Sequence, residues 1–259
     1  MKLLFIGDIF GRPGRRAMRG AIDDVVSKYG VDLVVANAEN AAGGFGLTPA
    51  IAKELFDCGA DVLTGGNHTW DKPQVVELLE SNERVLRPEN YPRHNPGSGI
   101  GIVKRDGVRV AVINLQGRVF MPQTDCPFAA IDRLLETYAD EADFFVEDMH
   151  GEATSEKMAM AWHLDGRVSA LVGTHTHVQT ADEQIFPQGM AYITDLGMTG
   201  PHNGIIGVKT EQSLGRFLHG RPSRFEPASG DLRFHGVVVD VDESSGRAQG
   251  IDRVQIRVG

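Results

Sequence analysis

The sequence predicts an α/β fold of the αββα sandwich type, in which two mixed β-sheets pack face to face and helices flank both outer faces. Three observations predict it. Short apolar runs alternate with helical patterns over most of residues 3–173, a hairpin signal interrupts that alternation, and later strand patterns follow one another with little helix between them. The chain has 259 residues and no visible linker, low-complexity tract or internal repeat, so we expect a single domain over 1–259.

The strands of the alternating part are predicted from short apolar runs, rich in Val, Leu or Phe, that are bounded by Gly or polar residues. Such runs are typical of strands covered on both faces, and their alternation with helices implies parallel pairing through right-handed crossovers. The runs cover residues 3–7, 33–38, 62–64, 144–146 and 170–173.

Helices are predicted between these strands. Pro at a first helical position, with Ser, Thr or Asp just before it, is a start signal, as at Thr48-Pro49 and at Asp71 before Pro73. The predicted helices cover residues 15–29, 49–57, 73–81, 131–140 and 154–164.

A hairpin interrupts this order, because two strand patterns flank an Asp-Gly turn at positions 106 and 107. More strand patterns follow near the C-terminal end, which indicates two sheets instead of one, and residues 222–230 are expected to form a polar loop. The hairpin strands are residues 101–105 and 108–115, and the later strands are 184–186, 191–194, 236–242 and 251–258.

The composition limits the partners and the compartment. With 26 Lys and Arg against 35 Asp and Glu, the net charge of −9 argues against tight binding to duplex nucleic acid, although a small anionic substrate could bind where positive charge is supplied locally. Two cysteines are too few for a disulfide framework or a Cys-based zinc site. Only four apolar residues precede Gly7, too few for a signal peptide or a membrane span. We therefore expect a cytoplasmic protein without a membrane anchor.

Polar side chains follow each predicted parallel strand. The carboxyl ends of parallel strands open on one edge of a sheet, where ligands of α/β folds usually bind. Each residue alone could be an ordinary turn or helix-cap residue, but carboxylates, amides and imidazoles together are a donor set for divalent metal. The residues are Asp8, Glu39, Asn40, Asn67, His68, His150, His175 and His177.

The His175-Thr176-His177 segment is the sharpest of these signals. Alternate residues of an extended segment project to the same side, so we expect the two imidazoles to reach one ion or two adjacent ions. An H-x-H pair also opens the metal site of amidohydrolase barrels, but there it lies near the first strand. Residues 97–101 are Gly-rich but lead into a hairpin, which favours a turn over a phosphate-binding loop, and no G-x-S-x-G motif is present.

These motifs, in this order, resemble those of the calcineurin-like metallophosphoesterases, which run D-x-H, G-D, G-N-H, a lone H and G-H-x-H. The chain departs from that pattern at Phe10, which stands where the first His would be, at Glu39-Asn40, and at Thr174 between Gly173 and His175. Those departures resemble the YmdB-like branch, whose members carry similar stretches to residues 7–11, 67–71 and 194–201. The similarity runs over nearly the whole chain.

The resemblance implies a dinuclear metal site with Glu39 bridging both ions. Asp8, Asn40 and His177 would complete the ligands of one ion, and Asn67, His150 and His175 those of the other. His68 would be the proton donor. Members of the branch are described as phosphodiesterases that act on cyclic nucleotides, above all 2′,3′-cyclic AMP, so a small phosphodiester is the implied substrate.

The chemistry of such a donor set is mixed in hardness, which favours iron or manganese, tolerates zinc and disfavours calcium. Two ions activate water and clamp a phosphoryl oxygen, and their charge explains how a protein of net charge −9 attracts a phosphodiester. His68 could instead only hydrogen-bond to groups near the ligands. Residues 43–46 form either a surface turn or a lid that places Phe45 near a base.

Alternative functions remain at this stage. The same two-ion clamp serves a phosphomonoesterase or nucleotidase, and a protein that holds metal and nucleotide without turnover would be a regulator. The other histidines, including His202, are interpreted as structural or exposed. A homo-oligomer is compatible with the size of the chain, but no particular residue indicates one.

Overall fold

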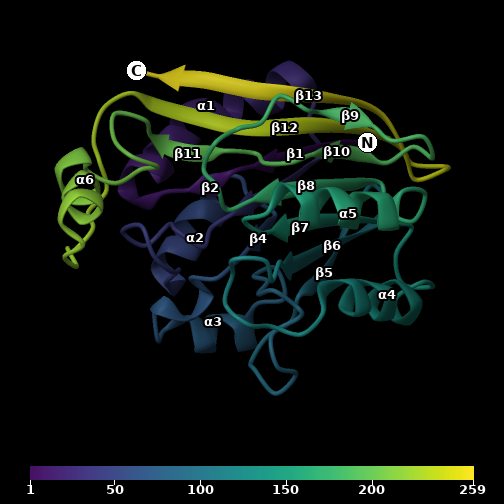
Figure 1. Cartoon of the computed structure of the whole chain (residues 1–259). Coiled ribbons are helices and arrows are strands. Elements are labelled where there is room, and N and C mark those ends of the chain that lie inside the picture. The colour runs from purple at the N-terminus through teal and green to yellow at the C-terminus, as the bar shows by residue number, and fades with distance from the viewer.

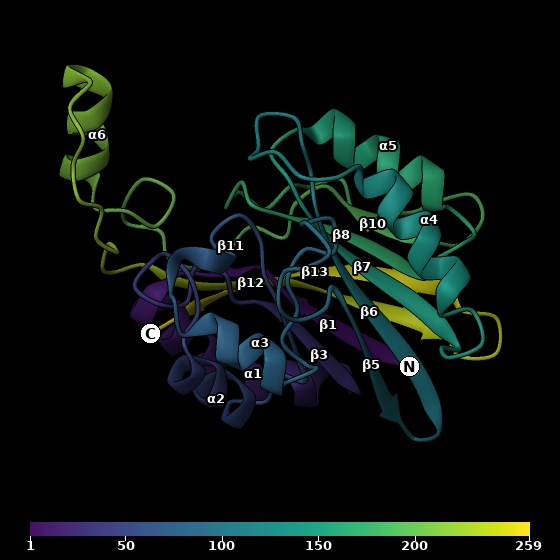
Figure 2. The same cartoon turned by 90° about the horizontal axis from the view of Figure 1, so that it is seen from below.

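The computed structural model describes residues 1–259 and has four layers, in the order helix, sheet, sheet, helix (Figures 1 and 2). Helices α1, α2 and α3 lie on the outer face of one sheet, and α4 and α5 lie on the outer face of the other. The predicted αββα sandwich of two mixed sheets is confirmed. The helices are α1 (Gly11–Tyr29), α2 (Pro49–Asp57), α3 (Val75–Ser81), α4 (Pro127–Thr137), α5 (Thr154–Leu164) and α6 (Thr210–His219), with a 3-10 turn at Thr69–Asp71.

The first sheet has seven strands and contains the N-terminal parallel strands. β1, β3 and β4 are parallel, while β12 is antiparallel to β1 and carries β13 on its other edge. In spatial order the strands are β2 (Asp8–Ile9), β11 (Met198–Pro201), β12 (Leu232–Asp242), β1 (Lys2–Ile6), β3 (Leu33–Asn37) and β4 (Val62–Thr64), with β13 (Arg247–Val258) beside β12.

The second sheet has six strands, and its middle is parallel. β6, β7, β8 and β10 run in the same direction, and the antiparallel strands β5 and β9 form the two edges. In spatial order the strands are β5 (Ile100–Arg105), β6 (Val108–Gln116), β7 (Phe144–His150), β8 (Ala170–Thr174), β10 (Ala191–Ile193) and β9 (Gln184–Ile185).

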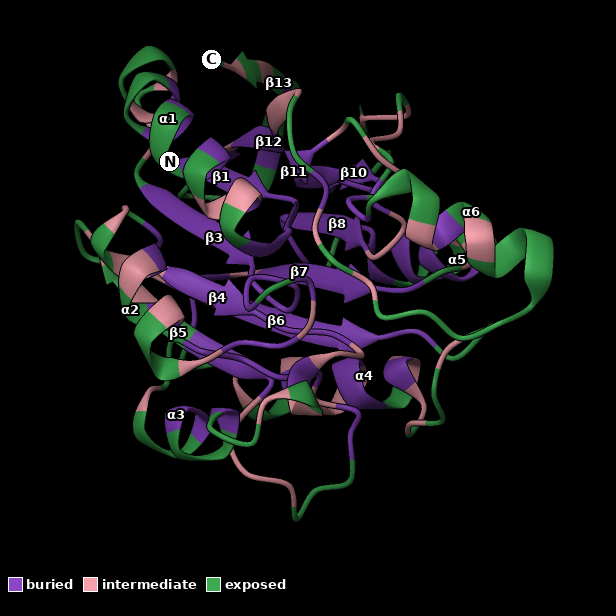
Figure 3. Ribbon diagram, turned by 90° about the vertical axis from the view of Figure 1, so that its left-hand side faces the viewer, coloured by how far each residue is buried: buried purple, intermediate pink, exposed green.

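The apolar residues of the strands fill three layers, because successive side chains of a strand point to opposite faces. Leu3 and Phe5 of β1 belong to the core between the two sheets, together with Val112 and Val146 from the second sheet. The alternate residue Leu4 packs under the helices on the other face. The inner strands of both sheets are therefore buried, whereas β9 is exposed, β13 is partly exposed and the helices are buried along one side (Figure 3). None of the helices combines the length and apolarity needed to cross a membrane.

Three predicted helices have different boundaries in the structure. α1 begins at Gly11 instead of residue 15, and α4 covers Pro127–Thr137 instead of 131–140. In both, a proline in the first turn is compatible with the helix because its missing N–H needs no partner there. α3 begins only at Val75, since Asp71 ends a separate 3-10 turn.

Three elements were absent from the sequence-based prediction. β2 and β11 are strands of two and four residues that pair with each other. Strands this short do not form an apolar run that can be recognised in the sequence. Helix α6 projects from the body of the molecule (Figure 2). Leu214, Phe217 and Leu218 stand at helical spacing, a signal that the sequence-based prediction missed, and in the structure all three are exposed.

Candidate metal centre

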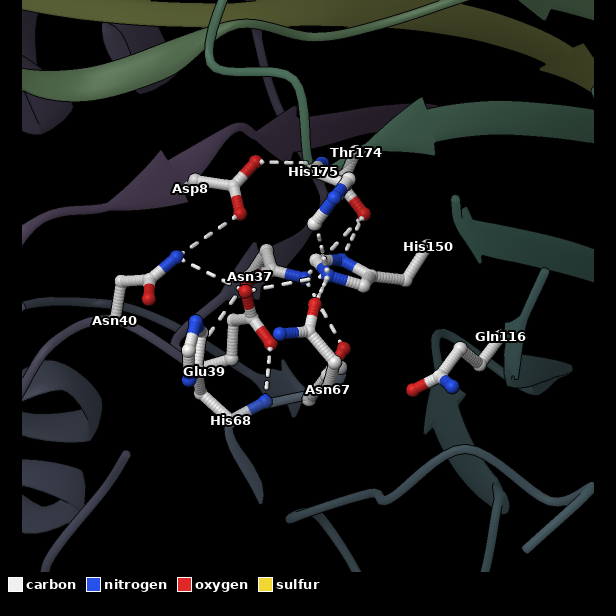
Figure 4. A network of polar contacts seen from close by, with 12 residues as sticks. Asp8, Asn37, Glu39, Asn40, Asn67, His68, Gln116, His150, Thr174 and His175 are labelled. Atoms are coloured by element: carbon white, nitrogen blue, oxygen red, sulfur yellow. Dashed lines mark hydrogen bonds and ion pairs between the residues drawn. The ribbon is translucent and has the colours of Figure 1, made fainter. Parts of the chain in front are cut away.

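The eight polar residues predicted from the strand ends lie together at one edge of the sandwich. The first sheet contributes the residues that follow β1, β3 and β4, and the second sheet contributes those at the ends of β7 and β8. Figure 4 shows side chains from both sheets converging on the same space. The residues brought together are Asp8, Glu39, Asn40, Asn67, His68, His150, His175 and His177.

Glu39 lies at the centre of this group and is 2% exposed. Its Oε1 lies 3.2 Å from His150 Nε2 and accepts a hydrogen bond from Asn40 Nδ2 at 3.0 Å, while its Oε2 accepts one from the backbone N–H of His68 at 3.0 Å. A side chain on Gly66 would fill this space, because a Cβ there would lie 2.3 Å from Glu39 Oε2. One carboxylate therefore contacts residues on both sides of the site.

On one side of Glu39 lie Asp8, Asn40 and His177. Asn40 Nδ2 is 3.4 Å from Asp8 Oδ1 and 3.2 Å from His177 Nε2, and Asp8 Oδ1 is 3.8 Å from His177 Nε2. Phe10, at the position where the wider family has a histidine, is buried and packs edge-on against His177, with ring centroids 5.5 Å apart. Phe10 thus contributes packing and no donor atom.

On the other side of Glu39 lie Asn67, His150 and His175. His150 Nε2 is 3.0 Å from Asn67 Oδ1 and 3.1 Å from His175 Nδ1. Donor atoms of Glu39, His150 and His175 all lie within 4.8 Å of one another, as a metal site requires. The family resemblance assigns Asn67, His150 and His175 to one ion, and this assignment stays a prediction.

Each of the three histidines has an oxygen at the nitrogen that faces away from the site. His150 Nδ1 donates to Thr174 Oγ1 at 2.9 Å, because the Thr174 hydroxyl itself donates to a buried aspartate. His177 Nδ1 donates to the carbonyl oxygen of Ile206 at 2.9 Å, and His175 Nε2 lies 3.1 Å from Glu152 Oε2. Metal-ligating histidines are normally oriented in this way, since the outer partner fixes the tautomer that leaves the inner nitrogen free to coordinate.

The lone pairs that this tautomer pattern leaves inside the site face one another. His150 Nε2 and His175 Nδ1 are 3.1 Å apart, and neither has an N–H to offer when its outer nitrogen carries the proton. Such an arrangement is stable with a positive charge between the two nitrogens, supplied either by a proton on His150 or by a metal ion. The donor chemistry of the site therefore fits a bound cation.

The pKa values of the buried residues also favour one positive charge at this place. Burial is the largest influence on His150 and would lower its pKa, but the carboxylates of Glu39 and Asp8 raise that pKa to about 9. Burial likewise opposes ionisation of Glu39, yet His150 and His68 lower its pKa to about 2. Burial and the neighbouring His150 lower the pKa of His175 to about 3. The buried acids thus favour one positive charge and disfavour a second proton beside it.

The His175-Thr176-His177 segment is not extended, so the geometric reason given for this pair was wrong. β8 ends at Thr174, and His175 and His177 adopt positive φ values of 103° and 66° in the loop that follows. A buried ion pair holds the loop: Lys157 Nζ donates to the Thr174 carbonyl at 2.8 Å, and its partner Asp195 accepts from the Thr176 N–H at 3.0 Å. Tertiary contacts, and not strand periodicity, therefore aim the two imidazoles.

Asp148 lies behind the site, where it bonds to the Thr174 hydroxyl that contacts His150, and it was not among the residues predicted from the sequence. It is buried, and it accepts hydrogen bonds from Thr64, Thr174 and Asn37, at 2.6 Å from Thr174 and 3.1 Å from Asn37. The available signal was its spacing, because Asp148 stands two residues before His150 in a strand and so points to the same face.

His68 lines a cleft of about 280 Å³ that also contains Glu39, Asn40, His175 and His177. Its Nδ1 is 2.8 Å from Asp71 Oδ2, an interaction that leaves Nε2 without a protein partner. An imidazole held in this way can deliver a proton to a group bound in the cleft.

The remaining histidines lie outside the cleft. His202 and His235 form a pair of their own, with ring centroids 4.7 Å apart, and His163 hydrogen-bonds to Asp132. The interpretation of these residues as structural agrees with their positions.

Comparison with known proteins shows which family this chain belongs to. A family model described as "YmdB-like protein" matches residues 4–254, almost the whole chain. The chain belongs to the YmdB-like family. One curated member, the 2′,3′-cyclic-nucleotide 2′-phosphodiesterase of Bacillus subtilis, is 47% identical over 256 residues, which cover 99% of this chain and 97% of that protein.

Solved structures agree with the family assignment. A structure described as a novel phosphatase from Mycoplasma pneumoniae superposes with a TM-score of 0.94 at 34% identity, covering 99% of this chain and 93% of that one. The NAD nucleotidase of Haemophilus influenzae matches all of this chain and 56% of its own with a TM-score of 0.63 at 14% identity. This second likeness shows the fold alone, and it confirms the predicted metallophosphoesterase-like architecture.

Proposed function

We propose that this YmdB-like protein is a metal-dependent phosphodiesterase that hydrolyses cyclic nucleotides of the 2′,3′ type at a dinuclear centre. The observation that carries the proposal is the buried Glu39 carboxylate, which contacts both His150 and Asn40 and so joins the two donor groups. The activity named for the Bacillus subtilis relative, 47% identical over nearly the full length of both chains, supports the substrate class.

The residues present fit two ions. We assign Glu39 as the bridge, with one ion held by Asp8, Asn40 and His177 and the other by Asn67, His150 and His175. For Asn40 to coordinate through Oδ1, its carboxamide must turn by half a rotation, because Nδ2 now faces Asp8 and Glu39. This mixed oxygen and nitrogen donor set favours iron or manganese.

When bound, two ions would supply an activated water and neutralise the charge of the phosphate. The chain itself handles the leaving group. A water oxygen bonds to phosphorus, the bond between phosphorus and O2′ breaks, and His68 donates its proton to O2′, which leaves a 3′-phosphate. Asp71, at 2.8 Å from His68 Nδ1, keeps the imidazole turned so that Nε2 is available for this transfer.

A phosphomonoesterase or nucleotidase is the second candidate, and the phosphatase description of the Mycoplasma pneumoniae structure favours it. The same set of charges can bind a terminal phosphate. Rates on a 2′,3′-cyclic nucleotide and on the matching 3′-mononucleotide separate the two, because a phosphodiesterase stops at the monoester whereas a nucleotidase continues to the nucleoside.

The test of the proposal uses isolated protein supplied with Mn²⁺ or Fe²⁺. We expect hydrolysis of 2′,3′-cyclic AMP and of bis-p-nitrophenyl phosphate, and loss of both activities in Glu39→Gln. Glu147→Gln is the matched control, because Glu147 is another fully buried glutamate of this chain but its carboxylate contacts none of the site residues. Activity that survives in Glu39→Gln would overturn the mechanism.

Four other expectations stay predictions. They are a single domain over 1–259, a cytoplasmic location, the absence of duplex nucleic acid as a partner, and a homo-oligomeric state.

A further inference from the structure

Three phenylalanine rings line the cleft, those of Phe10, Phe45 and Phe225. Phe45 is half-buried and packs edge-on against the proposed proton donor His68, with ring centroids 4.9 Å apart. Phe225 packs on the small apolar cluster that contains Phe10, the residue in contact with His177. Phe45 is therefore the phenylalanine beside the proton donor, and Phe225 lies with the phenylalanine beside His177.

Three glycines restrict the conformation of the loop that carries Phe45. Gly43, Gly44 and Gly46 have positive φ values of 76°, 102° and 77°, which side chains disfavour. A Cβ on Gly44 would lie 2.9 Å from the ring of the buried Phe10, which could not easily move away. The N–H of Gly44 donates to the carbonyl of Asn40 at 3.1 Å, so the loop is fixed to the turn that carries Glu39. Such a loop holds Phe45 in one place relative to the bridging carboxylate.

The chemistry of the substrate decides which ring is near the base. In a 2′,3′-cyclic nucleotide the base is on C1′, the direct neighbour of the carbon that bears O2′, whereas O3′ is one carbon further away. A donor that protonates O2′ must therefore be close to the base. With His68 as that donor, the base lies close to His68, where Phe45 is the neighbouring phenylalanine ring.

We propose that Phe45 stacks on the base of the cyclic nucleotide and thereby decides which of the two phosphate ester bonds is broken. This inference rests on the proposed function. Stacking on Phe45 places O2′ toward His68, and it accepts different bases because every base has a flat face. A ribose cyclic phosphate without its base lacks this constraint and can present either oxygen.

The experiment measures both rate and product. Parent protein, Phe45→Ala, Phe45→Leu and Phe45→Trp, each loaded with Mn²⁺, are given 2′,3′-cyclic AMP and ribose 2′,3′-cyclic phosphate, and the 2′- and 3′-monophosphate products are separated by chromatography. Phe45→Ala and Phe45→Leu should raise KM for the nucleotide by about tenfold. They should also release some 2′-phosphate. On the base-free substrate the ratio of 2′- to 3′-phosphate should be the same in the variants as in the parent, and Phe45→Trp should restore the parent product ratio on the nucleotide.

Phe225→Ala is the matched control, since it removes another phenylalanine ring of the cleft, one that packs near Phe10. A rise in KM that appears in Phe225→Ala and not in Phe45→Ala would place the base beside Phe225 and overturn the inference. So would an unchanged product ratio in Phe45→Leu, which keeps the apolar volume that the loop needs. In both results the parent still hydrolyses the cyclic nucleotide, so the proposed function stands. A parent that hydrolyses neither substrate overturns the proposed function and this inference together.

Discussion

Two histidine pairs in this protein have nearly the same spacing and opposite surroundings. The ring centroids are 4.8 Å apart in His150–His175 and 4.7 Å apart in His202–His235. In the first pair the nitrogens that face outward meet oxygens of Thr174 and Glu152, and those that face inward lie beside Glu39. In the second pair His235 Nδ1 is buried without any partner, and His235 Nε2 faces the Gln255 amide nitrogen at 3.0 Å.

The difference teaches that buried carboxylates, and not the proximity of imidazoles, make a cation site. Burial lowers the pKa of His235 to about 3, with His202 and Arg233 adding to the effect. Burial acts in the same direction on His150, yet Glu39 and Asp8 raise its pKa to about 9. The same ring therefore favours positive charge in one place and excludes it in the other.

Removing one imidazole from each pair should give the largest difference in metal content and activity between the two pairs. His150→Ala removes a donor that contacts both Glu39 and Asn67, so we expect the metal content to fall by at least one ion per chain and phosphodiesterase activity to fall about a thousandfold or more. His202→Ala, its control, should retain metal and stay within about threefold of the parent rate. Elemental analysis with kinetics on the same preparations measures both, and equal losses in the two variants would contradict the comparison.

Chelation should destabilise the protein through the first pair only. An ion that binds the folded state alone adds RT ln(1 + [L]/Kd) to the free energy of unfolding, about 3 kcal/mol at a hundredfold excess over Kd. We expect EDTA to lower Tm by several degrees in the parent and in His202→Ala, and to lower Tm by less in His150→Ala, which holds at least one ion fewer. Differential scanning fluorimetry gives all three values. A parent Tm insensitive to EDTA and to added Mn²⁺ would argue against a bound metal.

The outer partner of a ligand should have a smaller effect than the ligand. Thr174→Val keeps the shape of the side chain but removes the hydroxyl that accepts from His150 Nδ1 and donates to Asp148. Loss of such a partner weakens metal affinity by about 10- to 100-fold. Titration with Mn²⁺, followed by return of activity, should show that shift with full activity at saturating metal. Thr199→Val is the control, because Thr199 is another buried threonine and its hydroxyl bonds only to the backbone of His235.

His235, of the second pair, should lower the free energy of unfolding at acidic pH. Because folding lowers the pKa of His235 from 6.5 to about 3, its contribution to stability is fully present above pH 6.5 and is lost as the pH falls toward 3. In metal-free protein the free energy of unfolding should fall by about 1.4 kcal/mol per pH unit from this residue between pH 6 and 4. His235→Gln removes the titrating ring, so its urea-unfolding curves should show a shallower fall over that range. Parallel curves for the two proteins would contradict the effect.

Much of the fold could be predicted because its signals are local. Apolar runs such as 62–64 and the Pro-started helix 49–57 have the predicted bounds, since burial on both faces and a first-turn proline leave a mark in a few adjacent residues. Helix α6 was missed although Leu214, Phe217 and Leu218 have helical spacing. Gly215 lies inside this helix and lowers its helix propensity, and the helix projects from the body of the molecule.

The sequence by itself determined which residues approach the site, because the direction of a parallel strand forces whatever follows it to the same edge. That rule placed Asp8 with Glu39 in the first sheet and His150 with His175 in the second, and the packing of the two sheets then brought the two sets together. The tertiary structure alone decided how they face one another. Its contributions are the Thr174–Asp148 contact behind His150 and the left-handed turn at His175. The physical reason is that hydrogen bonds between segments far apart in the chain depend on how the two sheets pack, and no local pattern of residues records that distance.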